Sequence, residues 1–73
     1  MQATDIQKLI EAGLPDATVE VLGDDGQHFE GRVVCPSFAG KSLLAQHKMV
    51  YATLGDSFES ALHALSLKTS APR

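Results

Sequence analysis

Residues 17–35 have the sequence ATVEVLGDDGQHFEGRVVC, in which two strand-like runs flank a turn rich in aspartate and glycine. An Asp-Gly pair between two alternating, β-branched runs is a strong short-range signal for a β-hairpin. We expect the first strand over residues 17–22 and the return strand over about residues 28–35. Pro36 lacks a backbone N–H and ends the second strand. The rest of the fold can be placed relative to this hairpin.

The alternation also predicts which side chains of the hairpin face the core. Successive strand residues point to opposite faces, so one face collects most of the apolar side chains. The residues expected on that inner face are Ala17, Val19, Val21, Phe29, Gly31, Val33 and Cys35. A buried free cysteine behaves as a small hydrophobic residue, and the chain has no Cys-x-x-Cys motif to suggest metal or redox chemistry.

A helical pattern precedes the hairpin. Apolar residues at helical spacing predict a first helix over about residues 5–12. Thr4-x-x-Gln7 is typical of an N-terminal capping box, and Gly13 is suited to the left-handed conformation that ends many helices.

A longer helical pattern follows, over about residues 41–54. Its predicted apolar stripe consists of Leu43, Leu44, His47, Val50, Tyr51 and Leu54. Gly55 is a natural stop, and an aspartate-led capping pattern predicts a short helix over residues 57–62. Residues 63–69 alternate again and predict a third strand, with residues 70–73 as a frayed tail.

These elements predict an α+β domain with the order α-β-β-α-α-β. The economical arrangement is a two-layer fold in which the helices cover one face of a three-stranded sheet. The first two strands are antiparallel, and the third joins an edge of their hairpin. A chain of 73 residues is expected to form a single domain over residues 1–73.

Composition and charge exclude several classes of protein. The net charge is −3, from nine acidic and six basic residues, which disfavours autonomous tight binding to nucleic acid. No apolar run approaches the roughly 20 residues of a membrane span, and we expect no membrane association. A single cysteine and no visible signal peptide favour a reducing cytoplasmic location.

No catalytic motif is evident, and we expect the protein not to be an enzyme. Ala39-Gly-Lys-Ser42 is similar to the end of a phosphate-binding loop, but Cys35 occupies the position of the required first glycine. A turn followed by a helix start explains this segment better. The chemistry-bearing residues left without a role are three histidines, His28, His47 and His63.

Three segments together resemble the BolA family. They are VCPSFAGKSLLAQHKMVY at residues 34–51, HALSL at residues 63–67, and the hairpin turn GDDGQHF at residues 23–29. The first is similar to the central motif of the family and the second to its C-terminal histidine motif. Within the family, the short acidic chain with a histidine in its hairpin loop most resembles the bacterial IbaG branch.

The resemblance implies a fold similar to a type II KH domain, in agreement with the predicted element order. KH domains clamp nucleic acid with a Gly-x-x-Gly loop between two helices, whereas the Gly-x-x-Gly of this chain, residues 23–26, lies in the predicted hairpin turn. The KH-like fold makes a DNA- or RNA-binding regulator the alternative function. Without the KH clamp, we expect its binding to nucleic acid to be weak. A continuous basic face around Lys41 and Lys48 would favour this alternative.

The resemblance implies, as the leading function, an adaptor in iron–sulfur cluster assembly and trafficking that pairs with a monothiol glutaredoxin. In this family a [2Fe-2S] cluster is shared with the glutaredoxin cysteine and a glutathione thiol. Carried over to this sequence, the iron ligands are His63 and His28, whereas His47 is structural. The isolated chain is then expected to hold no cluster.

Overall fold

The computed structural model describes residues 2–23, 25, 28–55 and 65–72. Its helices and strands, in chain order, are α1 (Ala3–Gly13), β1 (Thr18–Leu22), β2 (Phe29–Val34), the 3-10 turn η1 (Pro36–Phe38), α2 (Leu43–Leu54) and β3 (Leu65–Ser70). The predicted α+β class and the order of these elements are confirmed. The short helix predicted over residues 57–62 lies outside the described residues.

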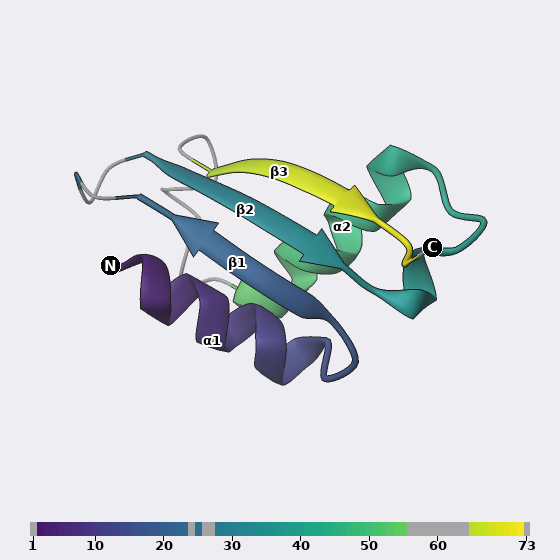
Figure 1. Ribbon diagram of the computed structural model, residues 1–73, viewed down its shortest axis with the longest axis horizontal. Helices are drawn as coiled ribbons and strands as arrows, with labels where there is room; N and C mark the ends of the chain where they lie inside the picture. The colour runs from purple at the N-terminus through teal and green to yellow at the C-terminus, as the bar shows by residue number, and fades with distance from the viewer. Residues whose placement is uncertain (1, 24, 26–27, 56–64, 73) are drawn as a thin grey trace.

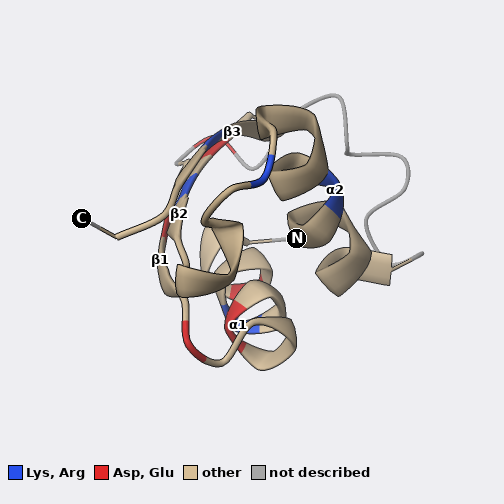
Figure 2. Ribbon diagram, turned by 90° about the vertical axis from the view of Figure 1, so that its right-hand side faces the viewer, with Lys and Arg blue, Asp and Glu red and all other residues tan. Residues whose placement is uncertain are grey.

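The three strands form one sheet in the order β1-β2-β3 (Figure 1). Strand β1 is antiparallel to β2, with Val21 opposite Gly31, as the hairpin predicts. Strand β3 joins the other edge of β2 and is parallel to it, with Leu65 opposite Phe29. Viewed along the sheet, α1 and α2 lie on the same side of it, and no described helix lies on the other face, here called the open face (Figure 2).

The core lies between the sheet and the two helices. Its buried residues are Ile6, Ile10, Val19, Val21, Phe29, Val33, Cys35, Phe38, Val50, Leu54 and Leu65. The inner face predicted for the hairpin is confirmed, with Ala17 half-buried at its margin. At about 25 cal/mol for each Å² of apolar surface removed from water, this shared core is the main source of stability.

Helix α1 begins two residues earlier than predicted. The Asp5 carboxylate accepts a hydrogen bond of 2.9 Å from the backbone N–H of Gln2. Gln2 is thus the residue that caps the helix, and Thr4 lies inside it. The capping box predicted for Thr4 and Gln7 is wrong. The Gln7 side chain instead accepts from the backbone N–H of Val21, at 3.3 Å. Since β1 is an edge strand, this bond satisfies a donor that has no neighbouring strand.

The left-handed conformation predicted for Gly13 is also wrong. Among the described glycines, only Gly40 and Gly55 have positive φ. Gly13 is instead a point of close approach between α1 and α2, where an added Cβ would lie 2.5 Å from Cγ2 of Thr53. Gly55, with φ of 55°, ends α2 as predicted.

The buried side of α2 differs from the predicted stripe in its first turn. Leu43 and Leu44 are 63% and 66% exposed, whereas Gln46 is buried with Val50 and Leu54. The Gln46 amide donates a 2.9 Å hydrogen bond to the carbonyl of Lys41. A polar residue thus takes an inner position because it closes the turn that leads into the helix, and hydrophobicity alone could not identify it.

Strand β3 extends one residue beyond its predicted end. Ser70 is paired with Val34, and its carbonyl accepts from the N–H of Cys35 at 3.0 Å. Ala71 then packs against the core. Ser70 therefore belongs to β3, and not to the free tail predicted over residues 70–73, because the parallel pairing continues to the end of β2.

The contact between Gly13 and Thr53 predicts a measurable cost for one added methyl group. We expect Gly13→Ala to lower the free energy of unfolding by about 1–3 kcal/mol, as overpacking does. The higher helix propensity of alanine would by itself raise the free energy of unfolding, by up to about 1 kcal/mol. Urea denaturation of this variant, beside Ala12→Gly at the neighbouring exposed position, separates the two effects. A Gly13→Ala protein more stable than the parent would contradict the packing account.

Candidate functional site

The end of the β1–β2 hairpin presents His28 to solvent. His28 immediately precedes β2, and its side chain is 79% exposed. Gly23, at the start of the loop, approaches it closely, since a Cβ there would lie 2.6 Å from the His28 carbonyl oxygen. Both the pairing of β2 and this close approach therefore fix the backbone that carries the imidazole.

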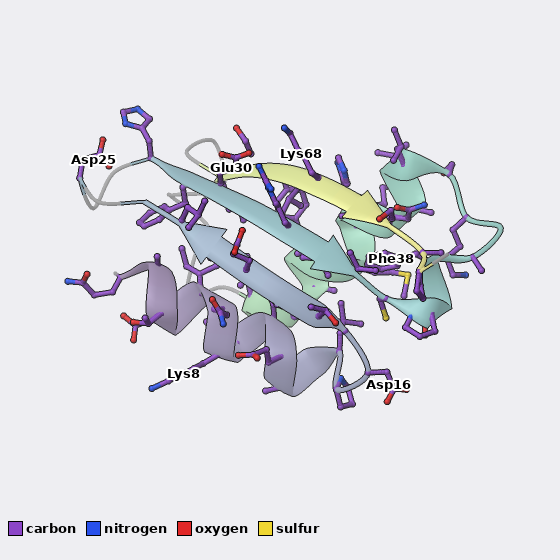
Figure 3. All side chains as sticks on the ribbon, viewed as in Figure 1. Lys8, Asp16, Asp25, Glu30, Phe38 and Lys68 are labelled. Carbon is purple, nitrogen blue, oxygen red and sulfur yellow. The ribbon has the colours of Figure 1, made fainter. Side chains whose placement is uncertain are left out.

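The Asp25 carboxylate holds His28 at two points. One oxygen, Oδ1, accepts from the His28 backbone N–H at 2.8 Å. The other, Oδ2, lies 3.0 Å from Nδ1 of the imidazole. Figure 3 shows Asp25 at the hairpin end of the sheet, far from Asp16 at the opposite end.

This arrangement has the chemistry of a metal ligand. An ionised carboxylate only accepts hydrogen bonds, and a neutral imidazole that donates to it from Nδ1 keeps its lone pair on Nε2. Imidazole nitrogen suits iron, copper, nickel and zinc, and histidine can replace cysteine on one iron of a [2Fe-2S] centre. His28 therefore fits the ligand role that the sequence predicts for it.

His63, the other predicted ligand, lies outside the described residues, and its role stays a prediction. The described chain resumes two residues later at Leu65, which pairs with Phe29 directly after His28. Strands β2 and β3, which follow the two histidines in sequence, therefore start at the same end of the sheet (Figure 1). Within the part of the chain that the structure describes, no three histidine, cysteine or acidic side chains are grouped to hold a metal ion.

The other residues considered from the sequence have structural positions. Cys35 is 1% exposed within the core, which confirms the prediction that it packs as a hydrophobic residue. His47 is half-buried on α2. The Ala39–Ser42 segment is a turn and a helix start, as predicted, because Gly40 has φ of 76° and the Ser42 hydroxyl accepts from the Ala45 N–H.

The described basic residues lie in several parts of the fold (Figure 2) and are Lys8, Arg32, Lys41, Lys48 and Lys68. Arg32 and Lys68 are opposite each other on β2 and β3, whereas six residues separate Lys41 from Lys48. On the open face of the sheet, Glu30 lies 3.6 Å from the Lys68 ammonium and 3.8 Å from the Arg32 guanidinium.

None of the described helices is both long and apolar enough to cross a membrane.

Comparison with known proteins places this fold in a single family. The family model for BolA-like proteins matches residues 11–73. The solved structure of a BolA protein homologue from Coxiella burnetii superposes with a TM-score of 0.85 at 45% sequence identity. That comparison covers 99% of this chain and 92% of the Coxiella chain.

Two curated relatives carry more specific names. The SufE-like protein 1 of Arabidopsis thaliana, chloroplastic/mitochondrial, is 47% identical over 51 residues, which are 68% of this chain and 14% of that protein. The DNA-binding transcriptional regulator BolA of Escherichia coli is 38% identical over 42 residues, 58% of this chain and 40% of that protein. The chain thus spans less than half the length of each of these relatives.

Asp25 is the residue of this site that the sequence patterns did not identify. It was recognised only as part of the Asp-Gly turn. The available signal was its spacing, because an aspartate three residues before His28 can bond to that residue's backbone N–H. The simultaneous contact with the ring depends on the side-chain rotamers and required the structure.

The burial of Cys35 predicts a protected thiol. We expect iodoacetamide to modify Cys35 slowly in the native protein and fully once guanidinium unfolds it, because native packing blocks access to the sulfur. A Cys35→Ala chain that also carries Leu44→Cys is the matched control, since Leu44 is exposed and its replacement should react at once. Equal native labelling of both thiols, followed by mass spectrometry, would show that Cys35 is accessible.

Proposed function

The chain belongs to the BolA-like protein family, and from this premise we propose that it is an adaptor in iron–sulfur cluster assembly and trafficking. It shares a [2Fe-2S] cluster with a monothiol glutaredoxin and catalyses no reaction of its own. The observation that carries the proposal is the exposed imidazole of His28, which the Asp25 carboxylate contacts at Nδ1. In this proposal His63 supplies the second imidazole.

The available donors support a shared site rather than a self-contained one. Cys35 is buried in the core, and the described residues offer no group of three potential ligands. Iron–sulfur clusters are usually held by cysteine thiolates. In the proposal the glutaredoxin cysteine and a glutathione thiol supply the thiolates, and this chain contributes imidazole on the other side.

Imidazole ligation gives the shared site properties that thiolates alone would not. Histidine in place of cysteine raises the reduction potential of a [2Fe-2S] centre. Neutral imidazole also leaves less negative charge around the iron than thiolate does, and it dissociates more readily on protonation. These properties suit an adaptor that must release its cargo to another protein.

The nucleic-acid alternative has less support. The name of the Escherichia coli relative favours it. Against it stand the net charge of −3 and the position of the Gly-x-x-Gly, residues 23–26, which connects two strands rather than two helices. Phosphate contacts provide most non-specific affinity, so we expect any binding to nucleic acid to be weak and steeply dependent on salt.

The proposal predicts that a cluster is assembled only with the partner. Anaerobic reconstitution of the isolated chain with iron and sulfide should give no visible iron–sulfur absorption. The same reconstitution with a monothiol glutaredoxin and glutathione should give a heterodimer with a visible chromophore, measured after size-exclusion chromatography. A chromophore that co-elutes with the isolated chain would contradict the predicted ligand set.

Replacing either proposed ligand, His63 or His28, by alanine should change the cluster and not the stability of the fold. His63→Ala should leave the thermal melt nearly unchanged and shift or weaken the visible circular dichroism of the reconstituted complex, because iron loses an imidazole. His28→Ala should act in the same way but more mildly, since water or a neighbouring group can replace a ligand from a loop.

His47→Ala is the matched control for these two variants. Its half-buried side chain should cost about 1 kcal/mol of stability through lost packing, and the cluster spectrum of the folded fraction should not change. If His63→Ala preserves the spectrum while His47→Ala abolishes it without unfolding, the assignment of ligands is reversed.

A further inference from the structure

We propose that Asp25 is a positioning residue that fixes the ring proton of His28 on Nδ1 and leaves Nε2 as the coordinating atom. This inference rests on the proposed function for its biological meaning. Its structural part, the state of the imidazole in the isolated protein, stands on the geometry of Asp25 and His28 alone.

The two contacts of Asp25 have different consequences. The 2.8 Å bond to the His28 backbone N–H shapes the loop, as an aspartate in a tight turn commonly does. It also fixes where the carboxylate lies, because β2 begins at the next residue and holds this backbone in the sheet. The 3.0 Å contact from Oδ2 to Nδ1 then orients the imidazole relative to the hairpin end of the sheet.

The same contact selects one tautomer. With the proton on Nδ1, the ring donates a charge-assisted hydrogen bond to the carboxylate. With the proton on Nε2, the Nδ1 lone pair would face a carboxylate oxygen, and the two would repel. A metal-bound histidine commonly donates its other ring N–H to such a carboxylate, which sets the tautomer and raises the basicity of the ligating nitrogen.

An isosteric replacement separates these two roles of Asp25. In Asp25→Asn, the amide oxygen can still accept from the His28 backbone N–H, so the loop keeps its turn. The amide –NH₂ then takes the place of Oδ2 and donates to Nδ1. We therefore expect the ring proton to move to Nε2, the nitrogen that the proposal assigns to iron. Asp25→Ala removes both contacts and should leave a mixture of tautomers.

Asp16→Asn is the control for the loss of one negative charge. Asp16 is exposed and lies at the opposite end of the sheet from Asp25 (Figure 3). This variant should leave the His28 tautomer as it is in the parent chain. Any effect common to both variants would then reflect net charge rather than position.

The test measures the tautomer directly, by two-bond proton–nitrogen correlation NMR of the imidazoles in the isolated protein. The spectra are recorded at mildly alkaline pH, where an ordinary imidazole is neutral. The proposal predicts protonated Nδ1 in the parent and in Asp16→Asn, protonated Nε2 in Asp25→Asn, and mixed signals in Asp25→Ala. Protonated Nε2 in the parent, or a tautomer that none of the Asp25 variants changes, would overturn it.

A second measurement distinguishes this inference from the proposed function. Asp25→Asn should weaken retention of iron in the reconstituted glutaredoxin complex by about 10–100-fold, the usual loss when a partner of a metal ligand is removed. We would measure this retention by chelator challenge beside Asp16→Asn. A changed tautomer with unchanged retention would refute Nε2 as the coordinating atom while leaving the tautomer assignment standing.

Discussion

The parallel pairing of β3 with β2 is the constraint on which the rest of the structure depends. Two parallel neighbours cannot be joined by a tight turn, so the chain between Val34 and Leu65 must cross back along the sheet. Helix α2 makes this crossing on the face that α1 also covers, and together they enclose one core (Figure 2). The crossing returns the chain to the hairpin end of the sheet, where β3 begins at Leu65 opposite Phe29.

The fold separates the cysteine thiol of the described chain from the imidazole of His28. The thiol of Cys35 lies at the end of β2 inside the core, whereas the imidazole of His28 lies at the start of β2 in solvent. Among the described residues, this arrangement offers imidazole nitrogen but no cysteine sulfur to a metal at the surface. In our account this is why a thiolate-bearing partner has to complete the site, and why such a partner would be engaged at the hairpin end.

Much of the fold could be predicted because local patterns and tertiary packing agree. The alternation in the hairpin gave the correct inner face, since side-chain direction in a strand follows directly from its period of two. The predictions failed where one residue satisfies a need that lies elsewhere in the chain. Gln7 reaches an edge strand, Gly13 admits a neighbouring helix, and Gln46 closes a turn.

The candidate site shows the same limit. Only the family resemblance predicted His28 and His63 as ligands, since imidazoles have no period or pattern that marks them as ligands. The contribution of Asp25 depends on two simultaneous contacts of one carboxylate, at 2.8 and 3.0 Å, and sequence spacing can suggest only the first. In our proposal the tautomer of His28 depends on Asp25, whose contact with the ring the motif does not indicate.

The most direct test of the central claim is pulsed electron paramagnetic resonance of the reduced cluster in the glutaredoxin complex. The histidines of this chain alone would carry the heavy nitrogen isotope, with the partner and glutathione unlabelled. Our account predicts strong nitrogen hyperfine couplings that change frequency and multiplicity on labelling, because imidazole from this chain is bonded to iron. Couplings that are absent, or that labelling leaves unchanged, would show that this chain contributes no imidazole to the cluster.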